Sequence, residues 1–531
     1  MRFSSAFRFL WALAGLVTVA SVRPVGGATF DLATATVSDV NAAFSAGALT
    51  SERLTELCLA RIKAYDHSGP KLNALITVNP RALDLARALD IERKTKGPRS
   101  PLHGIPVVLK DNYNTFDMPT TGGSKALADF QPETDASSVA RLRGAGAIIL
   151  AKANLGELAR TSVTLSSLGG QTLNPYDLTR TPGGSSGGSG VAVAASFGLL
   201  AMGTDTGQSI RSPASATAGV GFRGTFGLIG RTGVIPNTYT QDAIGPNTRT
   251  VADAAVMADI LVGFDAGDHS TWNSIGKTPK TYTTSLDPAG LKGARIGYVK
   301  NLFGDGTHPE HAVVTDVTMK AIQAMEHAGA SVVPITIPEL EAVNRDRSPL
   351  GIGVYESATV MNQYFASMGA RSKFRDLTAY VAAAGETIPS VVKGFRDSLA
   401  LTHSQTDPEY RRGLEKQAAF REALMKVMED NHLDALFYTH QRRLVVPVNT
   451  EQLERNGFMS SSSGLPALTV PGGFSPPTAE APLGVPVGVE FLGRPFAEPT
   501  LIRLAYAFER HTHFRQPPAS TPALPGERFQ Y

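Results

Sequence analysis

Apolar and polar segments alternate along the chain in lengths typical of strands and helices. Residues 105–109 (IPVVL) and 199–203 (LLAMG) are uncharged runs of strand length. Residues 191–197 (VAVAASF) form an uncharged run of small residues that suits a buried helix, and residues 409–428 predict a longer one. Because strand and helix signals follow one another in this way, the sequence predicts an α/β protein whose helices cover a mixed sheet.

Another helix is predicted to begin near Thr50. Its apolar stripe comprises Leu54, Leu57, Cys58 and Ile62. Cys58 is the single cysteine of the chain, so no internal disulfide can form. Its place on the stripe predicts that the thiol is packed in the core.

The first 28 residues differ from everything that follows. Arg2 and Arg8 give a basic start, residues 9–20 are an uncharged and mostly apolar run, and small residues precede Thr29. This pattern predicts a secretory signal peptide over residues 1–28 and therefore a secreted or periplasmic protein. The apolar run is shorter than the roughly 20 residues that span a bilayer, so we expect no stable membrane span after processing, with an uncleaved anchor as the alternative.

The composition is that of a globular protein with a large core. The chain has 531 residues, of which 42% are hydrophobic and 18% are charged. Residues 1–28 contain three arginines and no acid, so their removal lowers the formal net charge from +3 to 0. No basic patch then remains to indicate a nucleic-acid partner.

No pattern in the chain indicates a metal or cofactor site. Cysteine and histidine lack zinc spacing, and the phosphate-binding pattern GxxxxGK is absent. His308 and His311 could be ligands, but Pro309 and Glu310 between them are typical of the first turn of a helix. We therefore predict a helix that runs to Ala328, and neither a metal nor a cofactor.

Three polar positions stand beside the apolar runs. Lys110 follows the first predicted strand, Ser185 lies in the glycine–serine segment 183–190, and Ser209 lies in the polar loop after the second strand. A serine hydroxyl needs a base, and donors for the oxyanion, to act as a nucleophile. Burial lowers the pKa of a lysine toward neutrality, which lets the amine serve as that base. The pattern therefore favours a serine hydrolase with a lysine base.

Both serine segments are interpreted as tight loops. Segment 183–190 has the composition of a linker, but it leads directly into the apolar run at 191–197, and its glycines allow close backbone approach. The other loop passes into a predicted helix near Pro213, and a helix start exposes backbone N–H groups that can bind an oxyanion. The expected oxyanion donors are the backbone amides of Thr206, Gly207, Gln208 and Ser209.

These loops resemble the motifs of the amidase signature family, whose triad is a serine, a second serine after a cis peptide bond, and a lysine. The segments GIPVVLKDN, GGSSGGS and GTDTGQSIR match the family patterns in order, and they contain Lys110, Ser185 and Ser209 respectively. The resemblance implies that Lys110 is the base, Ser185 the bridging serine and Ser209 the nucleophile.

The resemblance covers most of the chain. It implies a three-layer α/β/α sandwich around a large mixed sheet of about eleven strands, built as a single domain over residues 29–531. Its core motifs lie at 100–255 and 460–510. Residues of about 265–454 match the family least and are expected to form part of a substrate-side cover. Candidate pocket residues in that cover are Tyr355, Met361, Tyr364 and Phe365, with a place in the core as the alternative.

Other loop residues have expected supporting roles. Asp205 and Arg211 flank the nucleophile at positions that match the family, so we expect them to brace its loop by hydrogen bonds and charge pairing. Ser186 is expected to help hold the lysine, with a simple turn hydroxyl as the alternative. Gln208 stands where the family usually has glycine. We hypothesise that it changes the loop or lies near the bound acyl group; otherwise it points away and only packs.

Together these observations predict an exported amidase that cleaves the C–N bond of a small carboxylic amide through an acyl-enzyme. Which amide it cleaves stays open, as does the choice between monomer and homodimer. An esterase or carbamate hydrolase with the same triad is one alternative, and a noncatalytic binding protein is another. Residues 183–187 also satisfy GxSxG, which would make Ser185 the nucleophile of an α/β-hydrolase with a histidine base. No later histidine, His403 included, has a distinctive local setting.

Overall fold

The computed structural model describes residues 27–345, 350–401 and 404–531. Its main sheet has eleven strands. They are β2 (Leu75–Val78), β3 (Pro106–Lys110), β4 (Ile148–Ala153), β7 (Leu200–Asp205), β8 (Val220–Arg223), β9 (Ala243–Thr248), β10 (Arg295–Val299), β11 (Ser331–Ile335), β12 (Ala435–Thr439), β13 (Ala467–Phe474) and β14 (Pro486–Leu492). Their spatial order is β11-β10-β12-β14-β13-β8-β9-β7-β3-β4-β2. Two groups of strands are parallel, namely β7, β3 and β4 and, on the other side, β11, β10 and β12. From β12 through β14, β13, β8 and β9 to β7, each strand is antiparallel to the next.

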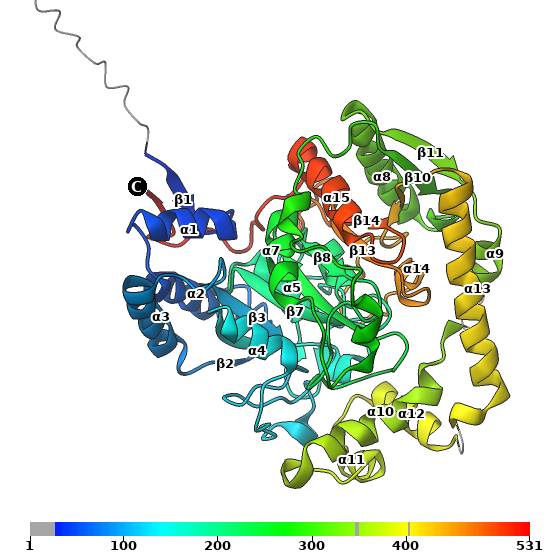
Figure 1. Ribbon diagram of the computed structural model, residues 1–531, viewed down its shortest axis with the longest axis horizontal. Coiled ribbons are helices and arrows are strands. Elements are labelled where there is room, and N and C mark those ends of the chain that lie inside the picture. Colours follow the sequence, from blue (N-terminus) through cyan, green and yellow to red (C-terminus); the bar gives the residue numbers. More distant parts are fainter. Residues whose placement is uncertain (1–26, 346–349, 402–403) are drawn as a thin grey trace, which may run out of the picture.

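Helices cover both faces of this sheet, which confirms the predicted three-layer sandwich (Figure 1). The covering helices include α2 (Ser51–Tyr65), α3 (Ala82–Lys96), α4 (Ser137–Gly144), α5 (Gly187–Ala194), α6 (Arg211–Ala216), α7 (Val251–Leu261), α8 (Pro309–His327) and α15 (Glu498–Thr512). Side chains of a strand alternate between the two faces. Val107 and Leu109 of β3 belong to the core that contains α4, α7 and α15, whereas Val108 belongs to the core that contains α3 and α5.

A second group of helices stands apart from the sheet at the bottom of Figure 1, and α13 leads from it back to the strands. It comprises α10 (Gly353–Ser367), α11 (Leu377–Ala383) and α12 (Pro389–Leu399), followed by α13 (Pro408–Asp430). We call α10, α11 and α12 the cover helices. They pack on Leu127, Phe130, Leu158 and Ile235. Within 265–454, β10, β11 and β12 join the main sheet, so the cover helices are only part of that range.

The remaining elements are short. They are α1 (Val37–Ser45), α9 (Glu339–Arg345), α14 (Phe458–Ser461) and the small pair β5 (Leu165–Ser166) and β6 (Gly170–Gln171). The first described strand, β1 (Thr29–Asp31), pairs antiparallel with the last, β15 (Arg528–Gln530), so the described ends of the chain lie together (Figure 1). Residues 1–26, which hold most of the predicted signal peptide, lie outside the described residues. In the described part, no helix has the length and apolarity needed to cross a membrane.

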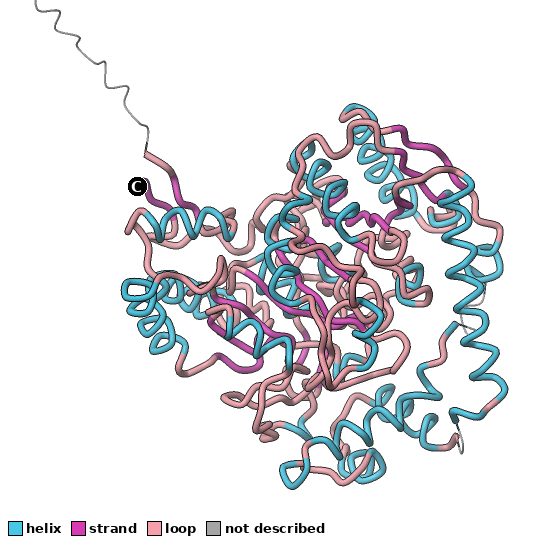
Figure 2. Tube along the Cα trace, viewed as in Figure 1, coloured by secondary structure: helices cyan, strands magenta, loops and turns pink. Residues whose placement is uncertain are grey.

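Helices and strands are spread along the whole described chain and are joined by loops (Figure 2). They follow the sequence pattern closely, with one shift at a glycine-rich segment. The two predicted strands beside the serine loops are β3 and β7, and Cys58 is buried in α2. Helix α5 begins at Gly187, four residues before the apolar run. A Cβ atom at Gly188 would lie 2.3 Å from the carbonyl oxygen of Asn154, so the glycines let this helix lie directly against the chain after β4.

Candidate active site

Two neighbouring strands bring the predicted catalytic residues to one edge of the sheet. Lys110 is the last residue of β3, and Ser209 lies in the turn between β7 and α6. β3 and β7 are parallel, so their carboxyl ends meet at the same edge. Ser185 lies just before α5, and α5 packs on both strands.

The Lys110 side chain is fully buried among hydroxyl groups. Its Nζ donates hydrogen bonds to Ser185 Oγ at 2.7 Å and to Thr204 Oγ1 at 2.8 Å. Burial lowers the pKa of Lys110 to about 7, although the charges of Asp205 and Asp242 act in the opposite direction. A neutral amine is therefore accessible near physiological pH.

A second buried lysine, Lys152 on the adjacent strand β4, shows what is different about Lys110. Lys152 Nζ lies 2.9 Å from a carboxylate oxygen of Asp111. Burial also lowers its pKa, but this carboxylate favours the charged form. Within the described ranges Lys110 contacts no carboxylate, so of the two it is the one suited to lose its proton.

The glycine–serine loop carries a cis peptide bond between Gly184 and Ser185. The backbone N–H of Ser186 donates to the carbonyl oxygen of Ser209 at 3.2 Å, which joins this loop to the loop of Ser209. Among the described residues, Ser209 Oγ has no hydrogen-bond partner, and it makes no direct hydrogen bond to Ser185. Ser209 is 8% exposed and lines a cavity.

Ser186 and Thr204 hold the lysine from behind. Ser186 Oγ donates to the carbonyl oxygen of Thr204 at 3.2 Å and accepts from the Thr204 N–H at 3.3 Å. The Thr204 hydroxyl also accepts a hydrogen bond from Asn112 Nδ2 at 3.1 Å. Ser186 therefore supports Lys110 indirectly, through its hydrogen bonds to Thr204.

Backbone N–H groups are available beside Ser209. The backbone amides of Gly207, Gln208 and Ser209 donate no hydrogen bond to any described residue. The Thr206 hydroxyl donates to Asp242 at 2.6 Å, which ties this turn to the segment before β9. Gln208 has an ordinary negative φ, so it occupies the position of the family glycine without a left-handed backbone.

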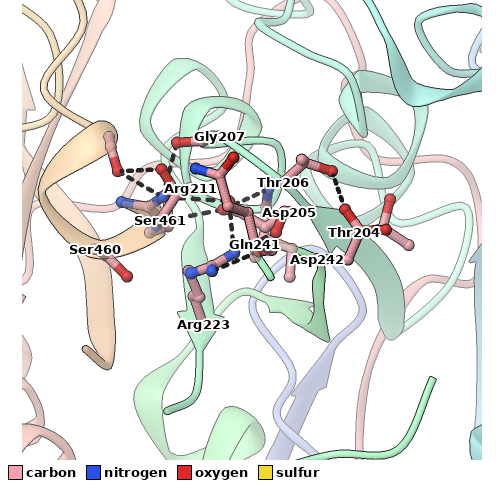
Figure 3. A network of polar contacts seen from close by, with 12 residues as sticks. Thr204, Asp205, Thr206, Gly207, Arg211, Arg223, Gln241, Asp242, Ser460 and Ser461 are labelled. Carbon is pink, nitrogen blue, oxygen red and sulfur yellow. Dashed lines mark hydrogen bonds and ion pairs between the residues drawn. The ribbon is translucent and has the colours of Figure 1, made fainter. Parts of the chain in front are cut away.

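Behind the turn lies a buried cluster of charges, whose two arginines both point toward Asp205 (Figure 3). Arg211 Nε and Arg223 Nη1 lie 3.0 and 3.1 Å from Asp205 carboxylate oxygens. Arg211 also lies 3.0 Å from Glu490 of β14, which hydrogen-bonds to His440. Burial by itself would raise the pKa of Asp205 and of Glu490. Arg211 and Arg223 outweigh it at Asp205, and Arg211 and His440 lower the pKa of Glu490 to about 2.

Arg211 also braces the turn directly. Its Nη2 donates to the carbonyl oxygens of Gly207 at 3.1 Å and Gly457 at 2.9 Å. The charge pairing and hydrogen bonding expected of Asp205 and Arg211 are thus present in the structure. Buried charges that are paired and hydrogen-bonded in this way hold a fixed geometry.

Two adjacent cavities open at this edge of the sheet. The larger, of about 790 Å³, is lined by Ser209, Gln208 and residues of the cover helices. The smaller, of about 250 Å³, shares Thr206 and Asn237 with it and is lined by Tyr364. Of the other candidate pocket residues, Met361 and Phe365 pack in the core of the cover helices and Tyr355 packs on the ring of Tyr410.

The structure also tests the alternative sites. Among the described residues, no histidine hydrogen-bonds to Ser185 or Ser209, as a nucleophile elbow would require; His403 lies outside those residues. His308 caps α8 by accepting from the N–H of Glu310 at 3.2 Å, so the predicted helix start is confirmed. No group of three or more potential metal ligands occurs in the described ranges.

Several site residues were not identified from the sequence. Thr204 contacts the lysine, Glu490 balances the charge of Arg211, and Arg160 lines the larger cavity. Thr204 lies inside the GTDTGQSIR segment and could have been found there. Glu490 and Arg160 are brought to the site by contacts between distant segments, and no local sequence pattern indicates such contacts.

Comparison with known proteins finds relatives that align over most of this chain. The family model described as Amidase matches residues 53–502. A glutamyl-tRNA(Gln) amidotransferase subunit of Myxococcus xanthus is 34% identical over 496 residues, covering 91% of this chain and 98% of its own. A probable amidase of Arabidopsis thaliana is 35% identical over 507 residues, covering 92% of each chain.

A solved structure gives the same result. The native peptide amidase of Stenotrophomonas maltophilia superimposes with a TM-score of 0.83 at 36% sequence identity, covering 92% of this chain and 99% of its own. The match extends over nearly all of both chains. The chain therefore belongs to the amidase family and is an amide-hydrolysing enzyme.

Proposed function

We propose that the enzyme hydrolyses carboxylic amides through an acyl-enzyme on Ser209, with Lys110 as the base and Ser185 as the proton relay. The observation that carries this proposal is the 2.7 Å hydrogen bond between Lys110 Nζ and Ser185 Oγ, made by a buried amine that contacts none of the described carboxylates. Such an amine can take a proton at neutral pH and return it later.

The proton path follows from these contacts. Neutral Lys110 takes the Ser185 hydroxyl proton while Ser185 takes that of Ser209, and Ser209 Oγ forms a bond to the carbonyl carbon. Protonated Lys110 then returns a proton through Ser185 to the nitrogen, and the C–N bond breaks. The same relay then takes a proton from a water molecule, which attacks the acyl ester on Ser209. The carboxylic acid is released and the Ser209 hydroxyl is restored. Because the serine hydroxyls make no direct hydrogen bond here, Ser209 must rotate toward Ser185 when substrate binds.

The negative charge on the carbonyl oxygen needs donors in both tetrahedral intermediates. The amides of Gly207, Gln208 and Ser209, together with that of Thr206, are suited to this because they adjoin the nucleophile and three of them have no acceptor among the described residues. One oxyanion donor contributes on the order of 3 kcal/mol to transition-state stabilisation.

Two features favour an independent exported hydrolase over a component of an amidotransferase. The predicted signal peptide would carry the chain away from cytoplasmic tRNA, and without it the formal net charge is 0. The relatives' names do not decide the question, because the amidase and the amidotransferase component are about equally similar to this chain in sequence. An esterase or carbamate hydrolase on the same residues remains the second candidate, since the same acyl-enzyme forms from either bond.

A covalent probe and a substrate panel test the proposal. A fluorophosphonate should label the parent at Ser209, and labelling should vanish in Ser209→Ala, whereas Ser460→Ala, which alters a buried serine outside the triad, should still be labelled. Turnover of aliphatic, aryl and peptidyl amides should fall at least about 10⁴-fold in Ser209→Ala. Faster turnover of matched esters than of every amide would favour the second candidate, and labelling at Ser185 would refute the assigned roles.

A further inference from the structure

The larger cavity contains an arginine that the proposed chemistry does not use. Arg160 lines this cavity together with Ser209, and its Nε and Nη2 atoms are buried without a hydrogen-bond partner among the described residues. Its guanidinium lies over the ring of Phe395, 4.2 Å from the centroid. Burial lowers the pKa of Arg160 only to about 10, so the side chain stays charged at neutral pH.

No acid in the described part of the chain pairs with this charge. Asp242 acts on Arg160 from a distance, but its carboxylate already accepts hydrogen bonds from Thr206 Oγ1 at 2.6 Å and from the Asn237 N–H at 2.7 Å. The charged residues that line the cavity are Arg160, Arg455 and Glu451, so its lining carries a net positive charge. A buried cation without a paired anion is unfavourable, and an anion in the cavity would offset that cost.

The backbone turn that presents Arg160 is tied to the catalytic loop. The preceding residues Leu158 and Ala159 both have left-handed backbones, with φ of 49° and 58°. Such a conformation is costly for residues other than glycine and tends to occur where a side chain must be aimed. The turn is fixed because the N–H of Gly156 donates to the carbonyl oxygen of Ser185 at 2.9 Å.

Gln208 adds a second unused polar group to the same cavity. Its side chain is 4% exposed, and both amide atoms are buried with no partner among the described residues. On the other side it is confined by Gly457, where an added Cβ atom would lie 2.5 Å from the Gln208 Cβ. Gln208 therefore packs on Gly457 and lines the cavity beside the nucleophile.

We propose that Arg160 and Gln208 form a subsite for a carboxylate on the amide substrate, so that anionic amides are the preferred substrate class. A guanidinium binds a carboxylate through two parallel N–H donors, which matches the free Nε and Nη2 atoms. The Gln208 amide offers one donor group and one acceptor to polar atoms between that carboxylate and the reactive carbonyl. This subsite rests on the proposed function, because it places its ligand beside Ser209.

Matched substrate pairs test the subsite on each side of the scissile bond. On the acyl side, glutaryl p-nitroanilide carries a carboxylate and pentanoyl p-nitroanilide does not. On the leaving side, 4-butyramidobenzoate is compared with butyranilide. The parent should prefer the anionic member of at least one pair, and Arg160→Gln should lower that ratio of kcat/KM values about 10- to 100-fold. Arg160→Lys, which keeps the charge, should recover part of the ratio.

A control variant distinguishes the loss of a positive charge in the cavity from the loss of one on the protein surface. Arg396→Gln removes an exposed arginine from α12, next to Phe395 and away from the cavity lining, and should leave the ratio unchanged. If the parent favours the neutral substrate of both pairs, the subsite proposal is wrong. It is also wrong if Arg160→Gln leaves the ratio of kcat/KM for the anionic substrate to that for the neutral one unchanged.

A binding measurement distinguishes failure of the subsite from failure of the proposed function. Glutarate, the acid product of the first substrate, is titrated by calorimetry into the parent and into Arg160→Gln. Binding to the parent that weakens at least about tenfold in the variant supports the subsite even if no amide is hydrolysed. Equal binding to both proteins, with normal turnover of the neutral anilides, would leave the amidase proposal intact and refute the subsite.

Discussion

At the scale of single residues, the surroundings of each lysine determine its chemistry. Lys110 and Lys152 lie on adjacent strands and are both fully buried. Only Lys152 has a carboxylate within 2.9 Å. Burial disfavours the charged form of both, and without a compensating anion the pKa of Lys110 falls to about 7.

This difference predicts the pH dependence of activity. The neutral amine is the reactive form, so kcat/KM should rise about tenfold per pH unit below about 7 and level off above it. Lys110→Arg keeps the positive charge but cannot release the proton. The variant should therefore lose both the activity and the rise of kcat/KM with pH. Near-parental amide hydrolysis by Lys110→Ala would show that another group is the base.

At the scale of elements, one buried charge cluster holds five parts of the fold together. Asp205 ends β7, Arg223 ends β8, Arg211 begins α6, Glu490 lies in β14, and His440 follows β12. Because Arg211 also binds the carbonyl oxygens of Gly207 and Gly457, the cluster fixes the turn that carries the nucleophile.

Neutralising one member should therefore destabilise the fold. Glu490→Gln leaves the buried charge of Arg211 only partly compensated, and we expect the free energy of unfolding to fall by about 3–5 kcal/mol. Glu498→Gln is the matched control, because Glu498 is equally buried, binds Thr225 rather than an arginine, and has a pKa raised by burial. Urea unfolding should show a much smaller loss for the control; equal losses would mean that the charge of Glu490 is unimportant.

The sequence predicted the parts of this site that lie in continuous segments. Lys110 and Ser209 follow apolar runs of strand length, so their position at the edge of the sheet could be inferred. Glu490 could not, because its partner Arg211 is 279 positions away. The start of α5 at Gly187 was missed for a related reason: glycine-rich composition favours a loop, and only packing against the segment around Asn154 makes the helix stable.

At the scale of the whole molecule, the predicted leader and the proposed site lie in separate parts of the chain. β1 starts at Thr29, and the fold from there on contains every residue of the proposed site. Residues 1–28 would then direct export without taking part in catalysis.

Protein expressed from residue 29 should therefore match the exported protein in melting temperature and kcat/KM. Amino-terminal sequencing of the exported protein should begin near Thr29, and Leu16→Arg, which places a charge in the apolar run, should block export. An exported protein that retains Arg2 would show that the segment is kept as an anchor.

The pairing of β1 with β15 brings the two ends of the segment from Thr29 to Gln530 side by side. Phe30 stacks on Phe529 with ring centroids 5.0 Å apart, and buried Arg61 lies 2.7 Å from Glu527. Deletion of β1 would thus remove the pairing partner of β15, and deletion of β15 would remove that of β1. For the same reason, a short peptide could join the two ends, and new termini could be opened in a surface loop while the sheet stays intact.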